Sequence, residues 1–162
     1  MVTQLECCLA VIVSRTPLLI FITLVLGLSM PSMASARELV VVSSKSTDYL
    51  PLSRFELRKL FLGYPVEQNG KVISAIRNTS DERAYKVFLQ KLIRLSAKNY
   101  ERRLMSKTFK TGAANVPTAD SLDALIDELQ QTDSTLSFMW MDEVESQPGV
   151  KVIEFIGDDT TN

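Results

Sequence analysis

The stretch RNTS, residues 77–80, places a guanidinium group and two hydroxyl groups directly after a short apolar run at residues 72–76. An amphipathic helix is predicted to follow at residues 81–95. A turn between a strand and a helix N-terminus is a common anion site, because unpaired backbone N–H groups and the helix dipole point towards it. The candidate ligands of an oxyanion are Arg77 and Ser80 first, with Thr79 and Arg83 second.

The same turn can also serve the helix alone. Thr79 and Glu82 have the spacing of a capping box, which would satisfy the first N–H groups of the helix internally. Asp81 and Glu82 also place two carboxylates in the first turn, where they complement the helix dipole but repel a phosphate. The residues alone favour the plain cap slightly and leave the anion site open.

Ser43 and Ser44 end the first predicted strand and are further candidates to face the same crevice, although a polar strand exit is the simpler interpretation. No catalytic constellation is found. The chain has no histidine, and its two cysteines, Cys7 and Cys8, lie near the N-terminus. Ser-His-Asp and Cys-His catalysis are thereby excluded, and a zinc site is not expected. We predict a protein that is not an enzyme and needs no cofactor or metal.

Residues 1–36 are predicted to be a secretory signal peptide. An apolar run precedes Pro31, and Ala34-Ser35-Ala36 is a cleavage motif, so cleavage is expected after Ala36. The alternative is an N-terminal anchor that is retained. Once processed, the protein is expected to be periplasmic and not an integral membrane protein. The net charge of −1 predicts no broad basic field and hence no nucleic-acid partner, although it allows one local basic cleft.

The elements that must position these residues alternate between strands and helices. Strands are predicted at residues 38–44, 71–76, 135–141 and 150–155, and helices at 52–63, 81–95, 96–109 and 121–131. This order predicts one α/β domain at residues 37–156, with a mainly parallel sheet flanked by helices, and a polar tail at 157–162. The expected core residues are Leu57, Leu60, Phe61, Val87, Phe88, Leu92, Leu125 and Leu129.

The order of these motifs resembles the type II periplasmic solute-binding proteins of the phosphate-binding kind. The likeness rests on the helix ending in Phe61-Leu62-Gly63, the strand followed by Arg77, and the Ser80-bearing turn before a helix that contains Phe88. The stretch YERRLMSKTFKTGAANVP and the closing strand SQPGVKVIEF are similar as well. The likeness covers most of the chain after residue 36. Full members of the family have two lobes, so this chain resembles a short, truncated member.

The resemblance implies a substrate-binding-like protein, of the type that serves ABC transporters, which binds phosphate or a related oxyanion at the turn formed by residues 77–80. Two departures weaken this implication. The family's Ser-Gly-Thr element is absent, with Asp81-Glu82-Arg83 in its place, and its Gly-x-Ile-Gly-Tyr strand is replaced by TLSFMWMDEV. The alternative is a periplasmic interaction module that has lost solute binding and engages an envelope or membrane sensor protein.

Overall fold

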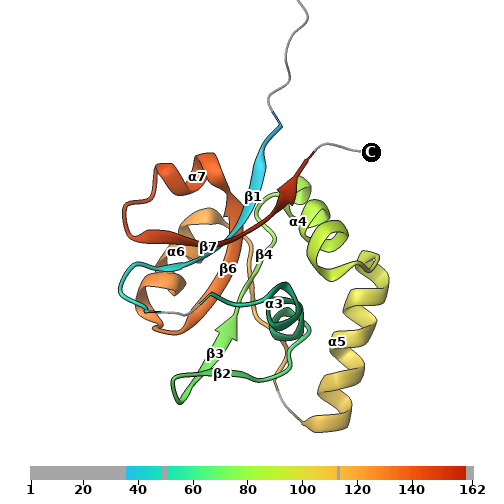
Figure 1. Cartoon of the computed structure of the whole chain (residues 1–162). Helices are drawn as coiled ribbons and strands as arrows, with labels where there is room; N and C mark the ends of the chain where they lie inside the picture. Colours follow the sequence, from blue (N-terminus) through green and yellow to red (C-terminus); the bar gives the residue numbers. More distant parts are fainter. Residues whose placement is uncertain (1–35, 49–50, 113, 160–162) are drawn as a thin grey trace, which may run out of the picture. The chain divides into compact units, whose positions relative to one another are not determined.

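The fold is built around a five-stranded sheet. The structure, a computed structural model, describes residues 36–48, 51–112 and 114–159. The strand order in the sheet is β2-β3-β6-β1-β7, and a separate two-stranded sheet pairs β4 with β5. Figure 1 shows the sheet with helices on its two faces. The strands are β1 (Glu38–Ser44), β2 (Val66–Gln68), β3 (Lys71–Ala75), β4 (Arg77–Asn78), β5 (Thr118–Ala119), β6 (Thr135–Trp140) and β7 (Val150–Asp158).

The helices form two layers. One layer packs on the face of the sheet that carries Phe138, and the other packs on the face that carries Met139. The first layer consists of α3 (Arg54–Phe61), α4 (Glu82–Phe88), the π-helix η1 (Leu89–Ile93) and α5 (Ala97–Thr111). The second layer consists of α6 (Leu122–Gln131) and the short α7 (Met141–Glu145).

The prediction of a mainly parallel sheet is wrong. Strand β1 is antiparallel to both of its neighbours, β6 and β7, and β2 is antiparallel to β3. Only β3 with β6 and the small β4 with β5 are parallel pairs. The alternation of strands and helices suggested parallel crossover connections. Instead, the two strands that neighbour β1 in the sheet, β6 and β7, both come from the C-terminal part of the chain. The molecule is therefore a small mixed α/β domain.

The predicted core is confirmed, because all eight of its residues are buried. Ring packing dominates the first cluster: Phe88 stacks on Phe138 with centroids 4.0 Å apart and meets Phe61 edge-on at 5.0 Å. Strand β6 is buried on both faces. Leu136, Phe138 and Trp140 enter the first cluster and Met139 enters the second.

Local sequence signals explain most element ends. Ser53 and Glu56 form the predicted capping box of α3, with Ser53 N 2.8 Å from the Glu56 carboxylate. Gly63, at φ +78°, allows the chain to leave that helix, where a side chain would be strained. Asn69 and Gly70 both have positive φ angles, as a tight hairpin turn between β2 and β3 requires.

The helix predicted at residues 81–95 is different in the structure. Helix α4 ends at Phe88, and five residues of π-helix follow as η1. Arg94 then takes a left-handed conformation with φ 57° and ψ 42° and terminates the segment. Ser96 caps α5, which begins at Ala97 close to the predicted start of the helix at 96–109. Helix α5 continues to Thr111 before Gly112, two residues beyond the predicted end.

The described residues, from Ala36 to Asp159, form one compact unit. The predicted signal peptide lies outside the described residues, apart from Ala36. Among the helices of the described residues, none combines the length and the apolar character that a membrane crossing needs.

Candidate functional site

Arg77 is held inside the protein rather than presented to solvent. It is 6% exposed, its Nε donates to the Val116 carbonyl at 3.3 Å, and its guanidinium is paired with the Glu101 carboxylate. The guanidinium also lies 5.8 Å from the ring centroid of Tyr100. The positive charge of Arg77 is therefore already matched by an internal carboxylate on α5.

The two hydroxyl groups of the turn have internal partners as well. Thr79 donates through its N–H and its hydroxyl to the Ala119 carbonyl, at 2.8 Å and 3.0 Å. Ser80 donates through its N–H and its hydroxyl to the Asn78 side-chain oxygen, at 3.0 Å and 2.6 Å. Asn78 is itself fully buried and donates to the Phe138 carbonyl. The turn is thus tied to β5 and β6 by its own polar groups.

Asp81 is the N-cap of α4, so the predicted cap at Thr79 is wrong. One carboxylate oxygen of Asp81 accepts the N–H groups of Arg83 and Ala84, and the other accepts Trp140 Nε1–H at 2.9 Å. Burial alone would raise the pKa of Asp81, but these hydrogen bonds hold that pKa below its ordinary value. A negative charge therefore occupies the helix end where an oxyanion would have to bind.

The remaining predicted ligands lie elsewhere. Arg83 is exposed and forms an ion pair with Asp159 at 2.5 Å. Ser43 is fully buried with its hydroxyl on the Ser44 carbonyl, and the Ser44 hydroxyl contacts Ser46. Arg77, Thr79 and Ser80 lie in the same short segment before α4. The five pockets found among the described residues contain none of the six predicted ligands.

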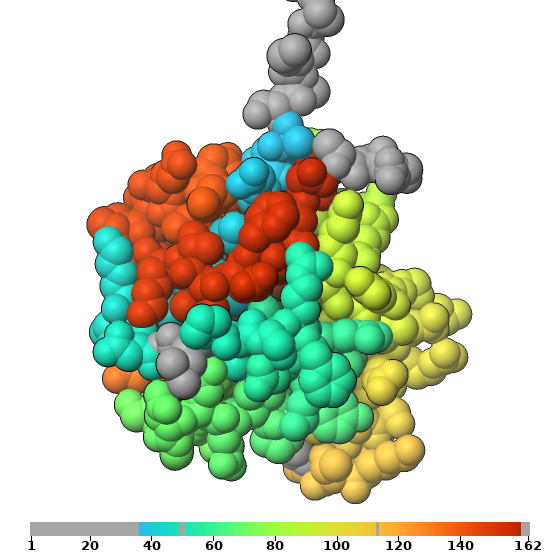
Figure 2. Space-filling view, viewed as in Figure 1, coloured from blue at the N-terminus to red at the C-terminus, as the bar shows by residue number. Residues whose placement is uncertain are grey.

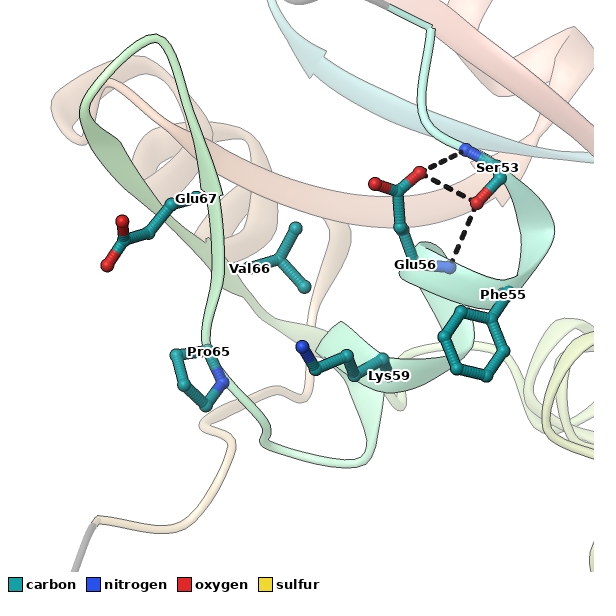
Figure 3. A pocket seen from close by; sticks show the side chains of 7 residues that line it. All are labelled: Ser53, Phe55, Glu56, Lys59, Pro65, Val66 and Glu67. Carbon is teal, nitrogen blue, oxygen red and sulfur yellow. Dashed lines mark hydrogen bonds between the residues drawn. The ribbon is translucent and has the colours of Figure 1, made fainter.

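A surface hollow with a volume of about 620 Å³ lies between the start of α3 and strand β2. Its polar groups are Glu56, Lys59, Glu67 and Ser53, and its apolar lining is Phe55, Pro65 and Val66. Figure 3 shows the Glu56 carboxylate turned to Ser53, where it completes the capping box. Glu67 points away from the hollow. The hollow thus offers one lysine and no converging set of polar groups, and the described residues contain no cluster suited to a metal ion.

Charge is divided between the two helical layers. The four helical segments α3, α4, η1 and α5 carry eleven Lys and Arg against three Glu, whereas α6 and α7 carry six Asp and Glu and no Lys or Arg. We call these the basic layer and the acidic layer. The net charge predicted no broad basic field but allowed a local basic region, and the basic layer is a local concentration of cations of that kind.

The basic layer also exposes large apolar side chains. Phe109 is 88% exposed, Phe55 is 76% exposed and Met105 is 52% exposed. On α5, the exposed residues Lys98, Arg102, Met105 and Phe109 follow one another at helical spacings of three and four. An exposed stripe that mixes cations and apolar groups is typical of a contact surface rather than of a plain solvated face.

This division of charge was missed in the sequence analysis because charges were summed over the whole chain. Counting by segment would have found it, since the fourteen Lys and Arg between residues 54 and 111 face only five Asp and Glu. After residue 111, eleven Asp and Glu accompany the single Lys151. Assigning the two segments to opposite faces of one sheet required the topology.

Comparison with solved structures found a similar one. It is the crystal structure of an ABC-type phosphate transport receptor from Vibrio cholerae, with a TM-score of 0.45 and 12% sequence identity. The superposition covers 73% of this chain and 46% of the receptor, so this chain spans about half the length of that protein. No protein-family model matches the chain, and no curated protein matches it. We therefore assign no family and no ligand from this similarity.

Proposed function

We propose that this protein is a non-enzymatic interaction module that docks on an envelope or sensor protein through its basic layer. The division of charge between the two helical layers carries the proposal. Opposite charge on opposite faces leaves one face suited to an acidic partner and the other face repelled by it. The exposed Phe109 and Met105 supply the apolar contacts that charge alone does not provide.

The cations of the basic layer are available for such a contact. Lys98, Arg103 and Lys110 have no ion pair within the described residues, and all three are exposed. By contrast, the cation outside the basic layer with the most partners, Arg37, is paired with Asp142, Glu143 and Asp81. Unpaired cations beside exposed apolar groups favour a partner over solvation.

Photo-crosslinking in the protein's natural host tests this proposal. A photoreactive amino acid at position 105, on the basic layer, should give a discrete cross-linked product. The same probe at position 127, on α6, should give none. Adding Arg102→Glu and Arg103→Glu should remove the product at position 105, whereas Asp123→Lys should leave it unchanged. A product that appears equally from both faces, or that survives the reversal of both arginines, would refute docking through the basic layer.

Binding of phosphate or a related oxyanion at residues 77–80 is the second candidate function. It is supported by the exposure of Thr79 and Ser80 beside the N-terminus of α4. An anion there must displace Glu101 from Arg77 and approach the Asp81 carboxylate. Calorimetric titration with phosphate, sulfate and small carboxylates tests this candidate. A binding heat that disappears in Arg77→Gln supports oxyanion binding at residues 77–80, and a binding heat that is unaffected by this variant excludes binding there.

We further propose export with cleavage after Ala36. Arg37 N lies 3.0 Å from the Asp159 carboxylate, so cleavage before Arg37 would create a positively charged amino group beside a negative charge. Such a charged pair is stronger than the neutral hydrogen bond it would replace. Mass spectrometry of a periplasmic extract should find Arg37 as the first residue. A full-length product retained in the membrane would refute processing at this position.

A further inference from the structure

A small pocket between α3 and η1 collects positive charge. Its volume is about 190 Å³, and four of its six lining residues are cations. Figure 2 shows the surface of α3, in blue-green, bordering the yellow-green surface of α4 and η1 on the viewed face. We call this the α3–η1 pocket, and it is lined by Arg54, Phe55, Arg58, Lys91, Leu92 and Arg94.

The backbone around η1 places two of these cations. The π-helix and the left-handed turn at Arg94 redirect the chain between Lys91 and Arg94, so that both side chains line the same pocket. The Arg94 N–H donates to the Leu89 carbonyl at 2.6 Å, which fixes this turn. Left-handed conformations of residues other than glycine cost energy and concentrate at functional positions.

The other two cations come from α3, and one of them is anchored. Arg54 donates through one terminal nitrogen to the carbonyls of Phe155 and Ile156, at 3.0 Å and 2.5 Å. Its guanidinium is thereby held at the edge of β7. Arg58 is different, because its Nε is buried and has no hydrogen-bond partner within the described residues. A buried donor without an acceptor is costly, and the guanidinium of Arg58 is not neutralised by an ion pair within the described residues.

Carboxylates do not balance this charge. Within the described residues, the only ion pair made by the four cations joins Lys91 to Asp158 at 3.7 Å. No acidic residue is among those that line the pocket. Four cations around one small cavity repel one another. An anion in the cavity would attract all four cations and offset that repulsion. Guanidinium groups match the oxygens of a tetrahedral oxyanion in two-point hydrogen bonds.

We propose that the α3–η1 pocket binds a tetrahedral oxyanion, namely a phosphate or sulfate group, with Arg58 and Arg94 as its principal ligands. Lys91 and Arg54 add charge at the margins. The exposed ring of Phe55 at the rim can contact an apolar continuation of the ligand, such as the acyl chains that a phospholipid carries beyond its phosphate. This site is distinct from the turn at residues 77–80 and does not depend on docking through α5.

The test is a calorimetric titration of the protein isolated from cells, with sodium phosphate and sodium sulfate at low salt. Arg58→Gln and Arg94→Gln should each weaken binding about tenfold. Lys110→Gln, which removes one charge from the same layer outside the pocket, should leave the affinity unchanged. Arg94 is exposed, so its variant separates loss of the site from loss of the fold, which a thermal melt of each variant also checks.

A second arm distinguishes a free ion from a headgroup. Vesicles of phosphatidylcholine with and without phosphatidylglycerol are sedimented with the wild type and with the same variants. Binding to phosphatidylglycerol alone, reduced by Arg58→Gln and Arg94→Gln, identifies the ligand as a lipid phosphate and supports the site. The proposal is overturned if neither arm shows binding up to tens of millimolar phosphate, or if binding is lost in Arg77→Gln and kept in both pocket variants.

Discussion

At the scale of single residues, Asp81 connects three parts of the molecule. Its carboxylate caps α4, accepts the indole N–H of Trp140 from β6, and lies 3.6 Å from the guanidinium of Arg37. Trp140 is fully buried, and its indole N–H loses this hydrogen-bond partner if Asp81 is removed. The residue that decides the character of the turn is therefore an acid, and the hydroxyl groups around it have secondary roles.

We expect Asp81→Ala to lower the free energy of unfolding by about 1–3 kcal/mol, because it removes a helix cap and leaves a buried indole N–H unpaired. Thr79→Ala should cost less, since the Thr79 backbone N–H keeps its bond to Ala119. Urea denaturation of both variants measures the difference. A larger loss of unfolding free energy in Thr79→Ala than in Asp81→Ala would show that Thr79, and not Asp81, is the main cap of α4.

The pKa of Asp81 gives a second prediction. This pKa is lower in the folded protein than in the unfolded chain, so the stabilisation is present above the unfolded value of about 3.9 and is lost as the pH falls through the folded value. Between about pH 5 and pH 2, the wild type should therefore lose more stability than Asp81→Asn, whose amide oxygen still caps the helix without titrating. Equal losses, measured by denaturant melts across this range, would show that Asp81 does not contribute to acid sensitivity.

At the scale of elements, the aromatic cluster joins α4 to the sheet. Phe88 is fully buried and contacts the rings of Phe61, Phe138 and Tyr100. Phe88→Ala should lower the free energy of unfolding by about 3–5 kcal/mol, because it removes this apolar contact and leaves a cavity. Phe109→Ala, at a ring that is 88% exposed, is the matched control and should change stability little. A change below about 1 kcal/mol for Phe88→Ala in urea melts would contradict the packing.

Most helices could be predicted because their ends carry local signals, such as the Ser53–Glu56 box and the Ser96 cap. The π-helix could not, since its five residues have the same apolar spacing as an ordinary helix and its termination at Arg94 lacks a glycine. Strand direction was also beyond reach. The apolar run of β1 fits a buried strand of either kind, and only pairing with β6 and β7 decides it.

The candidate site shows the same limit. Arg77 follows β3 and lies in β4. Its partner Glu101 lies 24 residues further along the chain, on α5. No local pattern joins the two residues, so the burial of Arg77 could not be predicted. The α3–η1 pocket likewise combines Arg58 and Arg94 from separate segments, which only the tertiary structure brings together.

At the scale of the whole molecule, the sheet separates two surfaces of opposite charge. The basic layer is held on the aromatic cluster of Phe61 and Phe88, and the acidic layer rests on a second cluster with Leu125 and Met139. Because the two clusters lie on opposite faces of the same strands, a substitution on one surface leaves the other supported. Surface variants on α5 and on α6 can therefore be compared directly as probes of binding.

The central place of β1 also governs the order in which the molecule can assemble during synthesis. Within the described residues, β1 pairs only with β6 and β7, so a growing chain leaves it without either neighbour until the last segments have been made. Contacts between distant parts of a chain slow folding. A nascent chain of this protein should therefore stay unfolded, and able to pass through a narrow channel, until it is nearly complete.

A fragment that ends at residue 131 should show no cooperative thermal transition by circular dichroism, whereas one that ends at residue 159 should unfold cooperatively. A cooperative transition in the shorter fragment would mean that the early segments fold without waiting for their sheet partners.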